Sequence, residues 1–467
     1  MNWLYDFFAG PLNTVAWIYI LLPCVFIGGL YFTIGTGAVQ FRRFGYAMKN
    51  TLGKMFTKME AEEGAVTPLQ AVTTALAATV GTGNIVGTSQ AIALGGYGAI
   101  FWLWMAALLG MVIKFAEVTL SIRFRERDAR GDWVGGPMYY IKNGLGPKWK
   151  WLAILFSTFA ILASFGIGNM SQANSIMDSI RSAVIAFNPD IADTTIVEWV
   201  VGLALAAVTA LVLFGGIKRI GAVTEKFVPF MAAVYIIFAL IVIGSNIGNI
   251  GHAFKLIIVG AFNPQAVLGA GAGIALKQAL VWGLRRSAFS NEAGLGSAAI
   301  AHAAAQTEGP IQQGVFGIFE VFMDTIVICT LTALTIISSG VEVEFGTVPG
   351  ASLITAAFAT VFGQKVASLF IAFALMMFAY STILGWSLYG TRCTQFLFGL
   401  KGAKVYQLIF IVIVVVGCVS PIEAVWNLAD TFNGLMAIPN FIALFALSPV
   451  LFKLVKEFFE DKSKLAA

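Results

Sequence analysis

Charged residues are scarce in this chain. They make up 11% of its 467 positions, whereas soluble domains carry about 25%. Hydrophobic residues make up 58%, and the mean hydropathy is +0.85. This composition excludes a soluble globular protein. The apolar residues come in runs of roughly 18 to 25, the length that crosses a hydrocarbon core about 30 Å thick. We therefore expect an all-α polytopic membrane protein.

Residues that bind metals or carry redox chemistry are also few. The four cysteines are scattered, which argues against a disulfide framework and against a zinc site. The two histidines, His252 and His302, have no ligand spacing between them, so we expect no haem or metal cofactor. No Ser/His/Asp or Cys/His constellation supports an enzyme. The opening MNWLYDFFAGPL lacks a basic residue and carries Asp6, which is not typical of a signal peptide.

Eleven apolar segments are long enough to span a membrane: 13–36, 67–95, 99–122, 151–177, 198–216, 227–247, 264–286, 313–338, 365–391, 404–421 and 425–455. With the N-terminus outside and the C-terminus in the cytoplasm, the cytoplasmic loops hold most of the 29 basic residues, Arg285 and Arg286 among them. The net charge of +5 is thus a topology signal and does not indicate nucleic acid. We expect a multi-pass protein of the cell membrane, surrounded by lipid.

Glycine interrupts one of these segments. ATVGTGNIVG, residues 78–87, places three glycines, two threonines and an asparagine inside the 67–95 span. Irregular backbone at membrane depth survives only where it is buried or lines a watery cavity. Freed carbonyls there can bind a cation, and a half-helix N-terminus can receive a carboxylate. The alternative is that Gly81, Gly83 and Gly87 merely allow close helix packing.

A second glycine-rich stretch, GAGAG at residues 269–273, lies near the start of the 264–286 span. That span runs opposite to the 67–95 span, so two interrupted spans stand at corresponding places in two five-helix halves. This pattern is typical of an inverted-repeat transporter. We divide the chain into an extra N-terminal helix (1–36), a cytoplasmic amphipathic segment (37–62), two repeats (63–250 and 251–456) and a cytoplasmic tail (457–467).

Longer motifs resemble the alanine or glycine:cation symporter family. They are VGTGNIVG (80–87), GGPMYYI (135–141), FGIGNMSQANSI (165–176), RRSAFSNEAGLGSAAIAHAAA (285–305) and WNLADTFNGLMAIPN (426–440). The resemblance runs from about residue 10 to about residue 450. It implies a sodium-coupled amino-acid symporter with the leucine-transporter type of five-plus-five inverted repeat and two discontinuous helices. The implied substrate is alanine, with glycine and D-alanine as alternatives, and Na⁺ is the coupling ion.

An amino-acid site needs donors for a carboxylate, acceptors for an ammonium and a pocket for the side chain. In FAYSTILGWSLYG, Ser381 and Thr382 stand one turn before Trp386, so the hydroxyls and the indole share a helix face. The indole would fill the volume that a larger substrate needs; the alternative is an interfacial anchor. The expected substrate-binding residues are Thr79, Thr82, Gly83, Phe165, Gly168, Gln172, Gly271, Gly273, Ile274, Thr382 and Trp386.

The resemblance also implies a sodium site between the first broken helix and the 365–391 span. Its ligands would be three carbonyls and two hydroxyls, those of Ala77, Val80, Phe378, Ser381 and Thr382. Five neutral oxygens suit a monovalent cation. A second cation site is predicted near Thr79, Asn84 and Asp324.

Ionisable residues inside spans cost about 2.5–3.5 kcal/mol at a helix centre. Lys114 and Glu117 lie three residues apart on one helix face, so we expect them to pair with each other. Lys277 is expected to bind backbone, or a carboxylate such as Asp324 or Asp430; a gating role and a structural role both stay open.

The segment SNEAGLGS, residues 290–297, is cytoplasmic in this topology. Glu292 is then expected to form a gate salt bridge with Arg285 or Arg286. The alternative is a helix cap at Ser290 or Asn291.

Two other functions remain as alternatives. Proton coupling needs a titratable group in the cavity, and Asp324 and Lys277 are the candidates. A cation channel would more naturally repeat one filter across subunits, whereas this chain carries two unlike interrupted spans. The sequence is compatible with a monomer.

Overall fold

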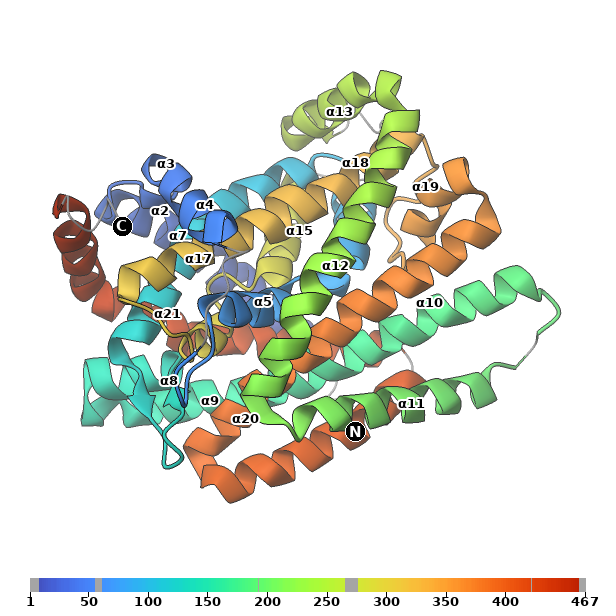
Figure 1. Cartoon of the computed structure of the whole chain (residues 1–467). Coiled ribbons are helices and arrows are strands. Elements are labelled where there is room, and N and C mark those ends of the chain that lie inside the picture. The colour runs from blue at the N-terminus through green and yellow to red at the C-terminus, as the bar shows by residue number, and fades with distance from the viewer. Residues whose placement is uncertain (1–7, 55–60, 192, 265–275, 421, 462–467) are drawn as a thin grey trace.

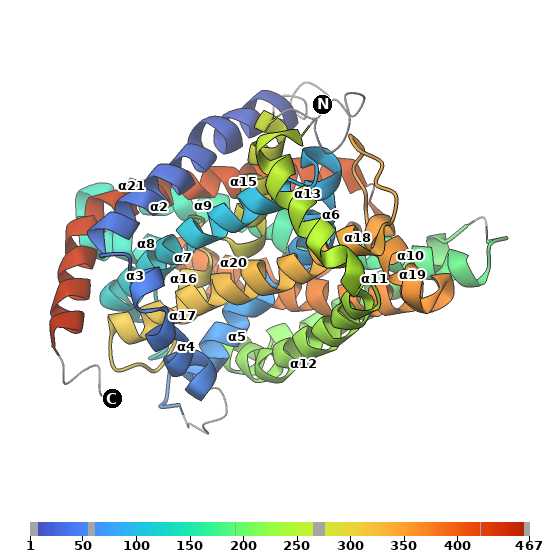
Figure 2. The same cartoon turned by 90° about the horizontal axis from the view of Figure 1, so that it is seen from above.

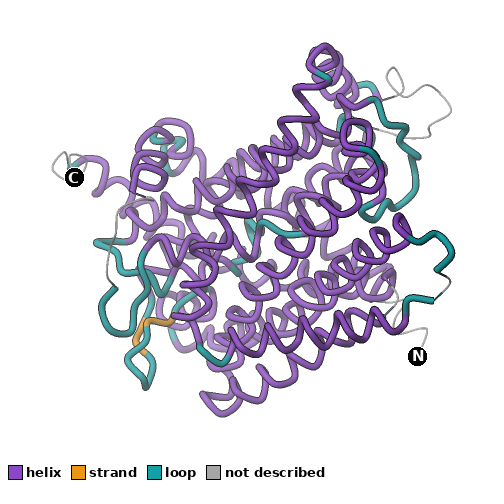
Figure 3. Tube along the Cα trace, turned by 45° about the vertical axis from the view of Figure 1, so that its right-hand side comes forward, coloured by secondary structure: helices purple, strands orange, loops and turns teal. Residues whose placement is uncertain are grey.

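The structure is a computed structural model that describes residues 8–54, 61–191, 193–264, 276–420 and 422–461. Almost all of this is helix, and a short antiparallel strand pair, β1 (Glu126–Arg127) and β2 (Trp133–Val134), lies at the edge of the molecule (Figure 3). Short stretches of 3₁₀- or π-helix carry η labels. Gly271, Gly273, Ile274 and the GAGAG segment lie outside the described residues.

The elements before the strand pair form the first quarter of the chain (Figure 1). They are η1 (Phe8–Leu12), η2 (Val15–Leu21), α2 (Leu22–Gly35), α3 (Val39–Arg42), α4 (Phe44–Thr51), η3 (Leu52–Lys54), α5 (Pro68–Thr79), η4 (Gly83–Gly87), α6 (Thr88–Gly95) and α7 (Ala99–Phe124).

The elements after the strand pair complete the bundle. Up to residue 264 they are α8 (Pro137–Tyr140), η5 (Ile141–Leu145), η6 (Pro147–Trp149), α9 (Lys150–Phe165), η7 (Gly166–Met170), α10 (Ser171–Phe187), α11 (Thr195–Leu213), α12 (Gly216–Ser245), η8 (Ile247–Asn249) and α13 (Ile250–Phe262). From residue 276 they are α15 (Leu276–Asn291), α16 (Ala298–His302), α17 (Pro310–Val321), η10 (Phe322–Cys329), α18 (Thr330–Ser339), α19 (Ser352–Phe362), α20 (Gln364–Val419) and α21 (Ile422–Glu460).

Eight helices in the described part of the chain are long and apolar enough to cross a membrane. The prediction of a helical, multi-pass membrane protein is therefore confirmed, while the count of eleven spans stays a prediction. The expected spans 365–391 and 404–421 both belong to α20, which bends at Gly399, where φ is +69. Only glycine adopts such a φ readily. Residues 250–262, which lie between the predicted spans 227–247 and 264–286, form α13.

The helices differ in how much of their surface the protein covers. The apolar window of α7 is 72% buried inside the protein, whereas that of α11 is only 22% buried. On α11, Ile196, Leu203 and Leu211 are 79%, 58% and 67% exposed. Since apolar side chains at the outside of a membrane protein meet lipid tails, α7 is a central helix and α11 a peripheral one.

The α5 helix begins and ends at positions that its sequence marks. At the start, Thr67 Oγ1 accepts the Gln70 N–H at 3.1 Å and Gln70 Oε1 accepts the Thr67 N–H at 3.2 Å, which is a capping box. At the end, Val80 leaves helical geometry with φ −79 and ψ 85. The chain resumes as η4 and α6, so the glycine-rich stretch does interrupt this helix.

A second helix is interrupted between α15 and α16. Non-helical backbone separates Asn291, the last residue of α15, from Ala298, the first of α16. The α5 helix packs against α16, and α6 packs against α15. The first half of one broken helix thus meets the second half of the other, so the two broken helices lie antiparallel.

Candidate functional site

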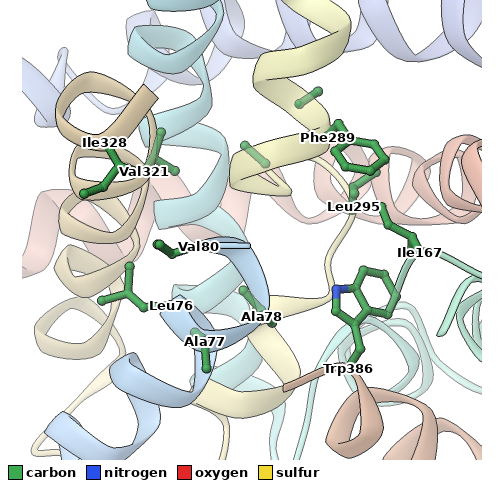
Figure 4. Packing of buried hydrophobic residues seen from close by; sticks show 14 of the residues in the cluster. Leu76, Ala77, Ala78, Val80, Ile167, Phe289, Leu295, Val321, Ile328 and Trp386 are labelled. Carbon is green, nitrogen blue, oxygen red and sulfur yellow. The ribbon is translucent and has the colours of Figure 1, made fainter. Parts of the chain in front are cut away.

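The two helix breaks lie against each other in the interior. A Cβ on Gly83 would lie 3.2 Å from Ser290 Cα and 3.3 Å from the Phe289 ring. Figure 4 shows Val80 at the end of α5 and Leu295 in the second break, with Trp386 of α20 beside Leu295. Since this irregular backbone is buried at the centre of the bundle, it meets the condition under which membrane proteins tolerate it.

Side chains accept hydrogen bonds from two of the backbone N–H groups in the first break. The Gly81 N–H donates to Asn84 Oδ1 at 2.8 Å, and the Thr82 N–H donates to Gln172 Oε1 at 3.4 Å. The Thr82 hydroxyl is fully buried and has no hydrogen-bond partner within the described part of the protein. A buried hydroxyl of this kind is costly unless something bonds to it, so the break offers a free polar group to a small solute.

A carboxylate on a neighbouring helix supports the second break. Glu117 Oε1, on α7, accepts the N–H groups of Gly294 and Gly296, each at 3.0 Å. It also accepts Asn440 Nδ2 at 2.6 Å, and Asn440 Nδ2 reaches the Gly294 carbonyl at 2.8 Å. Both glycines have positive φ, +92 and +78, which favours glycine over other residues. The amides of the break therefore find partners outside their own helix.

One sequence prediction about charges is wrong for this reason. Glu117 does not form an ion pair with Lys114; Lys114 Nζ lies 3.4 Å from Glu320 Oε1 on α17 instead. Glu320 Oε2 also lies 3.1 Å from His302 Nε2. The spacing of Lys114 and Glu117 along α7 could not reveal their actual partners. The glycine amides of the second break bind Glu117, and Glu320 of α17 lies next to Lys114.

The segment 290–297 is not a cytoplasmic loop, and Glu292 does not pair with an arginine. Glu292 is 1% exposed, and its Oε1 accepts the Trp386 indole N–H at 2.7 Å. Its other oxygen, Oε2, accepts the Ser297 hydroxyl. Asn291 Oδ1 accepts the Ala293 N–H at 3.0 Å and so closes the turn that ends α15.

The position of Arg285 relative to the first span also differs from the prediction. Its Nη2 is 2.6 Å from Asp430 Oδ2 and 2.9 Å from Asn13 Oδ1. Its guanidinium carbon lies 5.1 Å from the centroid of the Trp17 ring. Asn13 and Trp17 belong to the start of the first span, so Arg285 shares the end of the molecule where that span begins. The prediction had put them on opposite faces.

Lys277 forms none of the predicted carboxylate pairs. It is exposed at the start of α15, and no ion pair of Lys277 is found in the described part of the chain. Asp430 pairs with Arg285, and Asp324 is bonded to Asn84 and other neighbours. Neither carboxylate is left for the lysine.

The structure brings several of the predicted substrate-binding residues together. A Cβ on Gly81 would lie 2.2 Å from Thr382 Oγ1 and 3.5 Å from Gln172 Oε1. A Cβ on Gly168 would lie 2.2 Å from Trp386 Cβ, so η7 approaches α20 closely there. These contacts join the first break, η7 and α20 into one site.

Two other predicted residues make contacts outside this cluster. The ring of Phe165 is 5.1 Å from the Tyr406 ring and 6.2 Å from the Phe410 ring, both on the second part of α20. Thr79 turns back along its own helix, where its hydroxyl donates to the Ala75 carbonyl at 3.2 Å.

The predicted sodium ligands lie where α5 ends against α20. A Cβ on Gly385 would be 2.6 Å from the Cβ of Ala78, between Ala77 and the break. On α20, Ser381 Oγ and Thr382 Oγ1 donate to the Phe378 carbonyl at 2.8 and 3.1 Å. Each hydroxyl donates its hydrogen to a carbonyl of its own helix, so the lone pairs of its oxygen are still free to coordinate a cation.

Asn84 and Asp324, predicted as a second cation site, are in direct contact. Asp324 Oδ1 accepts Asn84 Nδ2 at 2.7 Å and Ser290 Oγ at 3.1 Å, while Oδ2 accepts Thr325 Oγ1 at 2.7 Å. Asn84 also accepts the Gly81 N–H in the first break, and Ser290 lies just before the second break. The buried Asp324 carboxyl is therefore connected to both breaks through hydrogen bonds.

Sequence reasoning missed three residues of the site: Glu117, Glu292 and Asn440. Their signal was the G-x-G pair in SNEAGLGS together with Glu292 and Asn440 inside the motifs that carried the family resemblance, and Glu117 inside a predicted span. A positive-φ glycine pair with no solvent nearby needs buried partners for its amides, and a mid-span glutamate and asparagine supply them.

Comparisons with known proteins place this chain among its relatives. The family model described as "Sodium:alanine symporter family" matches residues 1–466 of this chain. The sodium/alanine symporter AgcS of Methanococcus maripaludis is 42% identical over 458 residues, covering 97% of each chain. GlnT of Bacillus subtilis, a probable sodium/glutamine symporter, is 36% identical over 466 residues, covering 99% of this chain and 92% of GlnT.

A solved structure shares the fold. The crystal structure of MhsT in complex with L-phenylalanine has a TM-score of 0.58 at 15% sequence identity, covering 85% of this chain and 99% of MhsT. This likeness concerns the fold alone: the chain has a leucine-transporter-like neighbour, while the exact helix count and the inverted repeat stay predictions. Relatives and family alike are transporters rather than enzymes. The match over nearly the whole length shows that this chain belongs to the sodium:alanine symporter family.

Proposed function

We propose that the chain imports small neutral amino acids together with Na⁺ by alternating access. Alanine is the preferred substrate in this proposal, with glycine and D-alanine as alternatives. One observation carries it: two antiparallel broken helices meet at their breaks, with Gly83 against Ser290. Discontinuous helices in this arrangement form the substrate and ion sites of many secondary transporters.

The proposed substrate position lies between the two breaks and α20. The Thr82 hydroxyl and the amides near Gly83 would receive the carboxylate, and the Gln172 side chain would contribute a further hydrogen bond. Thr79, Phe165, Gly271, Gly273 and Ile274 remain part of the predicted set. Gly168 and the indole of Trp386 would limit the space for the side chain, which explains a preference for small substrates.

The hydrogen bond between Trp386 and Glu292 supports this role for the indole. A tryptophan that anchors a protein at the membrane interface keeps its N–H near water. Here the side chain is 1% exposed and its N–H is committed to a buried carboxylate of the second break. The ring is therefore held in one orientation, as the wall of a selective pocket must be.

The proposed sodium position lies between α5 and α20, with carbonyls of Ala77, Val80 and Phe378 and hydroxyls of Ser381 and Thr382. Val80 supports it because its backbone is non-helical, which turns its carbonyl away from the helical ladder. A cation there would contact the same break that receives the substrate carboxylate, and this shared contact would couple the two.

The architecture that accompanies this proposal has eleven spans, the N-terminus outside and the C-terminus in the cytoplasm. The first span stands outside two five-helix repeats, 63–250 and 251–456. The antiparallel packing of α5 with α16 and of α6 with α15 supports the repeat. The second break described by the structure lies at residues 292–297, whereas the GAGAG segment named from the sequence lies outside the described residues.

Proton coupling is the second candidate, and Asp324 is the observation that favours it. Its carboxyl is fully buried and contacts Asn84 of the first break and Ser290 at the second. A proton that comes and goes at Asp324 would change both contacts and thereby the shape of the site.

Uptake into proteoliposomes separates the two candidates. Labelled alanine is followed while a sodium gradient and a pH gradient are imposed separately. The proposal expects accumulation with the sodium gradient at equal pH on both sides. Accumulation with a pH gradient alone, in sodium-free buffer, would reject sodium coupling, and Asp324→Asn would then be expected to abolish it.

A further inference from the structure

A groove of about 670 Å³ lies where the first span and the last helix end on the same side of the molecule. One wall comes from the end of α2 and from α3, and the other comes from the last two turns of α21. In Figures 1 and 2, α3 and the C-terminal end of α21 occupy the same corner. The groove is remote from the two helix breaks.

Positive charge dominates the groove. Arg42, Arg43, Lys453 and Lys456 line it, against one carboxylate, Glu460. Lys456 pairs with Glu460 at 3.9 Å and Lys453 with Glu457 at 3.7 Å, and all four side chains are mostly exposed, at 57–75%. Exposed pairs one helical turn apart bind weakly. The lysines therefore remain available to a multivalent anion.

The floor of the groove is apolar. Phe452 lies against Gly35, whose absent Cβ would be 2.0 Å from the Phe452 ring. The Arg43 guanidinium lies 4.7 Å from the centroid of the Phe459 ring, which fixes its position at the wall. A fully hydrated ion would gain no binding energy from an apolar floor, whereas an amphipathic ligand could bury its apolar part against it.

An apolar stripe leads away from the groove along α2. Ile27, Leu30, Tyr31 and Ile34 recur at helical spacing and are 62%, 44%, 42% and 79% exposed. They belong to the first candidate membrane span, which ends at Gly35 next to the groove. Lipid tails cover such side chains in a membrane. A tail-binding stripe thus ends at a cationic groove.

We propose that this groove binds the headgroup of an anionic phospholipid. The phosphate lies between the two arginines of the α3 wall and the two lysines of α21, and the acyl chains lie along α2. Basic residues beside the end of a span attract anionic lipids. Such a lipid bridges the first span and the last helix, so its binding stabilises the fold independently of transport.

Thermal unfolding of the purified full chain in detergent tests the proposal. Phosphatidylglycerol is titrated in, with phosphatidylcholine of the same acyl chains and inorganic phosphate as separate arms. We expect phosphatidylglycerol to raise the Tm saturably and the other two to leave it nearly unchanged. An equal rise with phosphatidylcholine would overturn the anionic preference, and an equal rise with inorganic phosphate would overturn the lipid assignment.

Two double variants locate the site. Arg42→Gln/Arg43→Gln and Lys453→Gln/Lys456→Gln each remove two charges, and each basic residue near a membrane surface contributes about fivefold. Each is therefore expected to weaken phosphatidylglycerol binding by roughly 25-fold. The matched control is Lys148→Gln/Lys404→Gln, which removes two exposed lysines outside the groove and is expected to bind as wild type.

The lysine variant keeps the test decisive if the arginine variant fails to fold. Its two side chains are 75% and 73% exposed, so their substitution removes no buried packing. If the lysine variant bound phosphatidylglycerol as tightly as the control variant does, the groove would not be the site.

Discussion

Trp386→Ala is the substitution that tests the origin of selectivity most sharply. The indole is 1% exposed, its N–H is bonded to Glu292 at 2.7 Å, and it lies against Gly168. Removing it opens space beside the two breaks. A fully buried tryptophan costs about 3–5 kcal/mol of stability on truncation to alanine, so the variant is expected to unfold at a lower temperature than wild type.

The opened space sets the size of the expected change in selectivity. Leucine carries three more carbons than alanine, and each buried CH₂ contributes about 0.8 kcal/mol. Leucine binding should therefore improve by about 2.4 kcal/mol relative to alanine, a factor of roughly 50. Alanine itself gains no contact from the larger pocket, so its own affinity should fall or stay constant.

The assay is sodium-driven uptake of labelled alanine in proteoliposomes, with leucine as competitor. Trp199→Ala is the matched control, because Trp199 is 49% exposed on the peripheral α11 and should leave selectivity unchanged. Trp386→Phe keeps an aromatic ring without the N–H, and it serves if the alanine variant does not fold. An alanine variant that folds, transports alanine and excludes leucine as wild type does would refute the pocket assignment.

Three further outcomes follow from the contacts. Gly81→Ala places a Cβ 2.2 Å from Thr382 Oγ1, so alanine uptake should fall at least about tenfold, a loss that equals only about 1.4 kcal/mol of binding. Thr382→Ala removes a proposed sodium ligand and should raise the sodium concentration for half-maximal uptake about tenfold, whereas Ser387→Ala, a neighbouring buried hydroxyl on α20, should not. Burial opposes charge on Asp128, but hydrogen bonds from Gln395 and from backbone amides outweigh it and lower its pKa below 3.8. The stability it contributes is present above pH 3.8 and is lost at lower pH, so the Tm difference between wild type and Asp128→Asn should shrink there.

Each of these outcomes can fail in a recognisable way. Wild-type uptake by Gly81→Ala would mean that the first break is not packed as described. An unchanged sodium dependence in Thr382→Ala would remove that hydroxyl from the cation site. A Tm difference for Asp128→Asn that persists unchanged at acid pH would show that its charge contributes nothing.

The first break was predictable from sequence because its cause is local. Glycines and hydroxyl residues crowd residues 78–87, and the capping box at Thr67 and Gln70 fixes where the helix starts. Val80, the residue before Gly81, is where helical geometry ends. Thr382 and Gln172 could be placed near this break because each is a polar residue inside an apolar span, Thr382 on α20 and Gln172 on α10.

The second break was not predictable in the same way. Arg285 and Arg286 lie just before this break. Because basic residues are typical of cytoplasmic loops, their presence led to the prediction that the whole segment is cytoplasmic. In the structure Arg285 is neutralised by Asp430, and the backbone of the break is held by Glu117. Both partners come from other helices, so nothing in the local sequence could distinguish a buried break from a charged loop.

The most direct test of the central claim is a structure of the protein determined with alanine and Na⁺ bound. The account predicts alanine density between the two breaks, with its carboxylate near Thr82 and its methyl group toward Trp386, and an ion within reach of Thr382. Alanine density elsewhere in the bundle, with both breaks closed against each other and Thr82 unliganded, would contradict it.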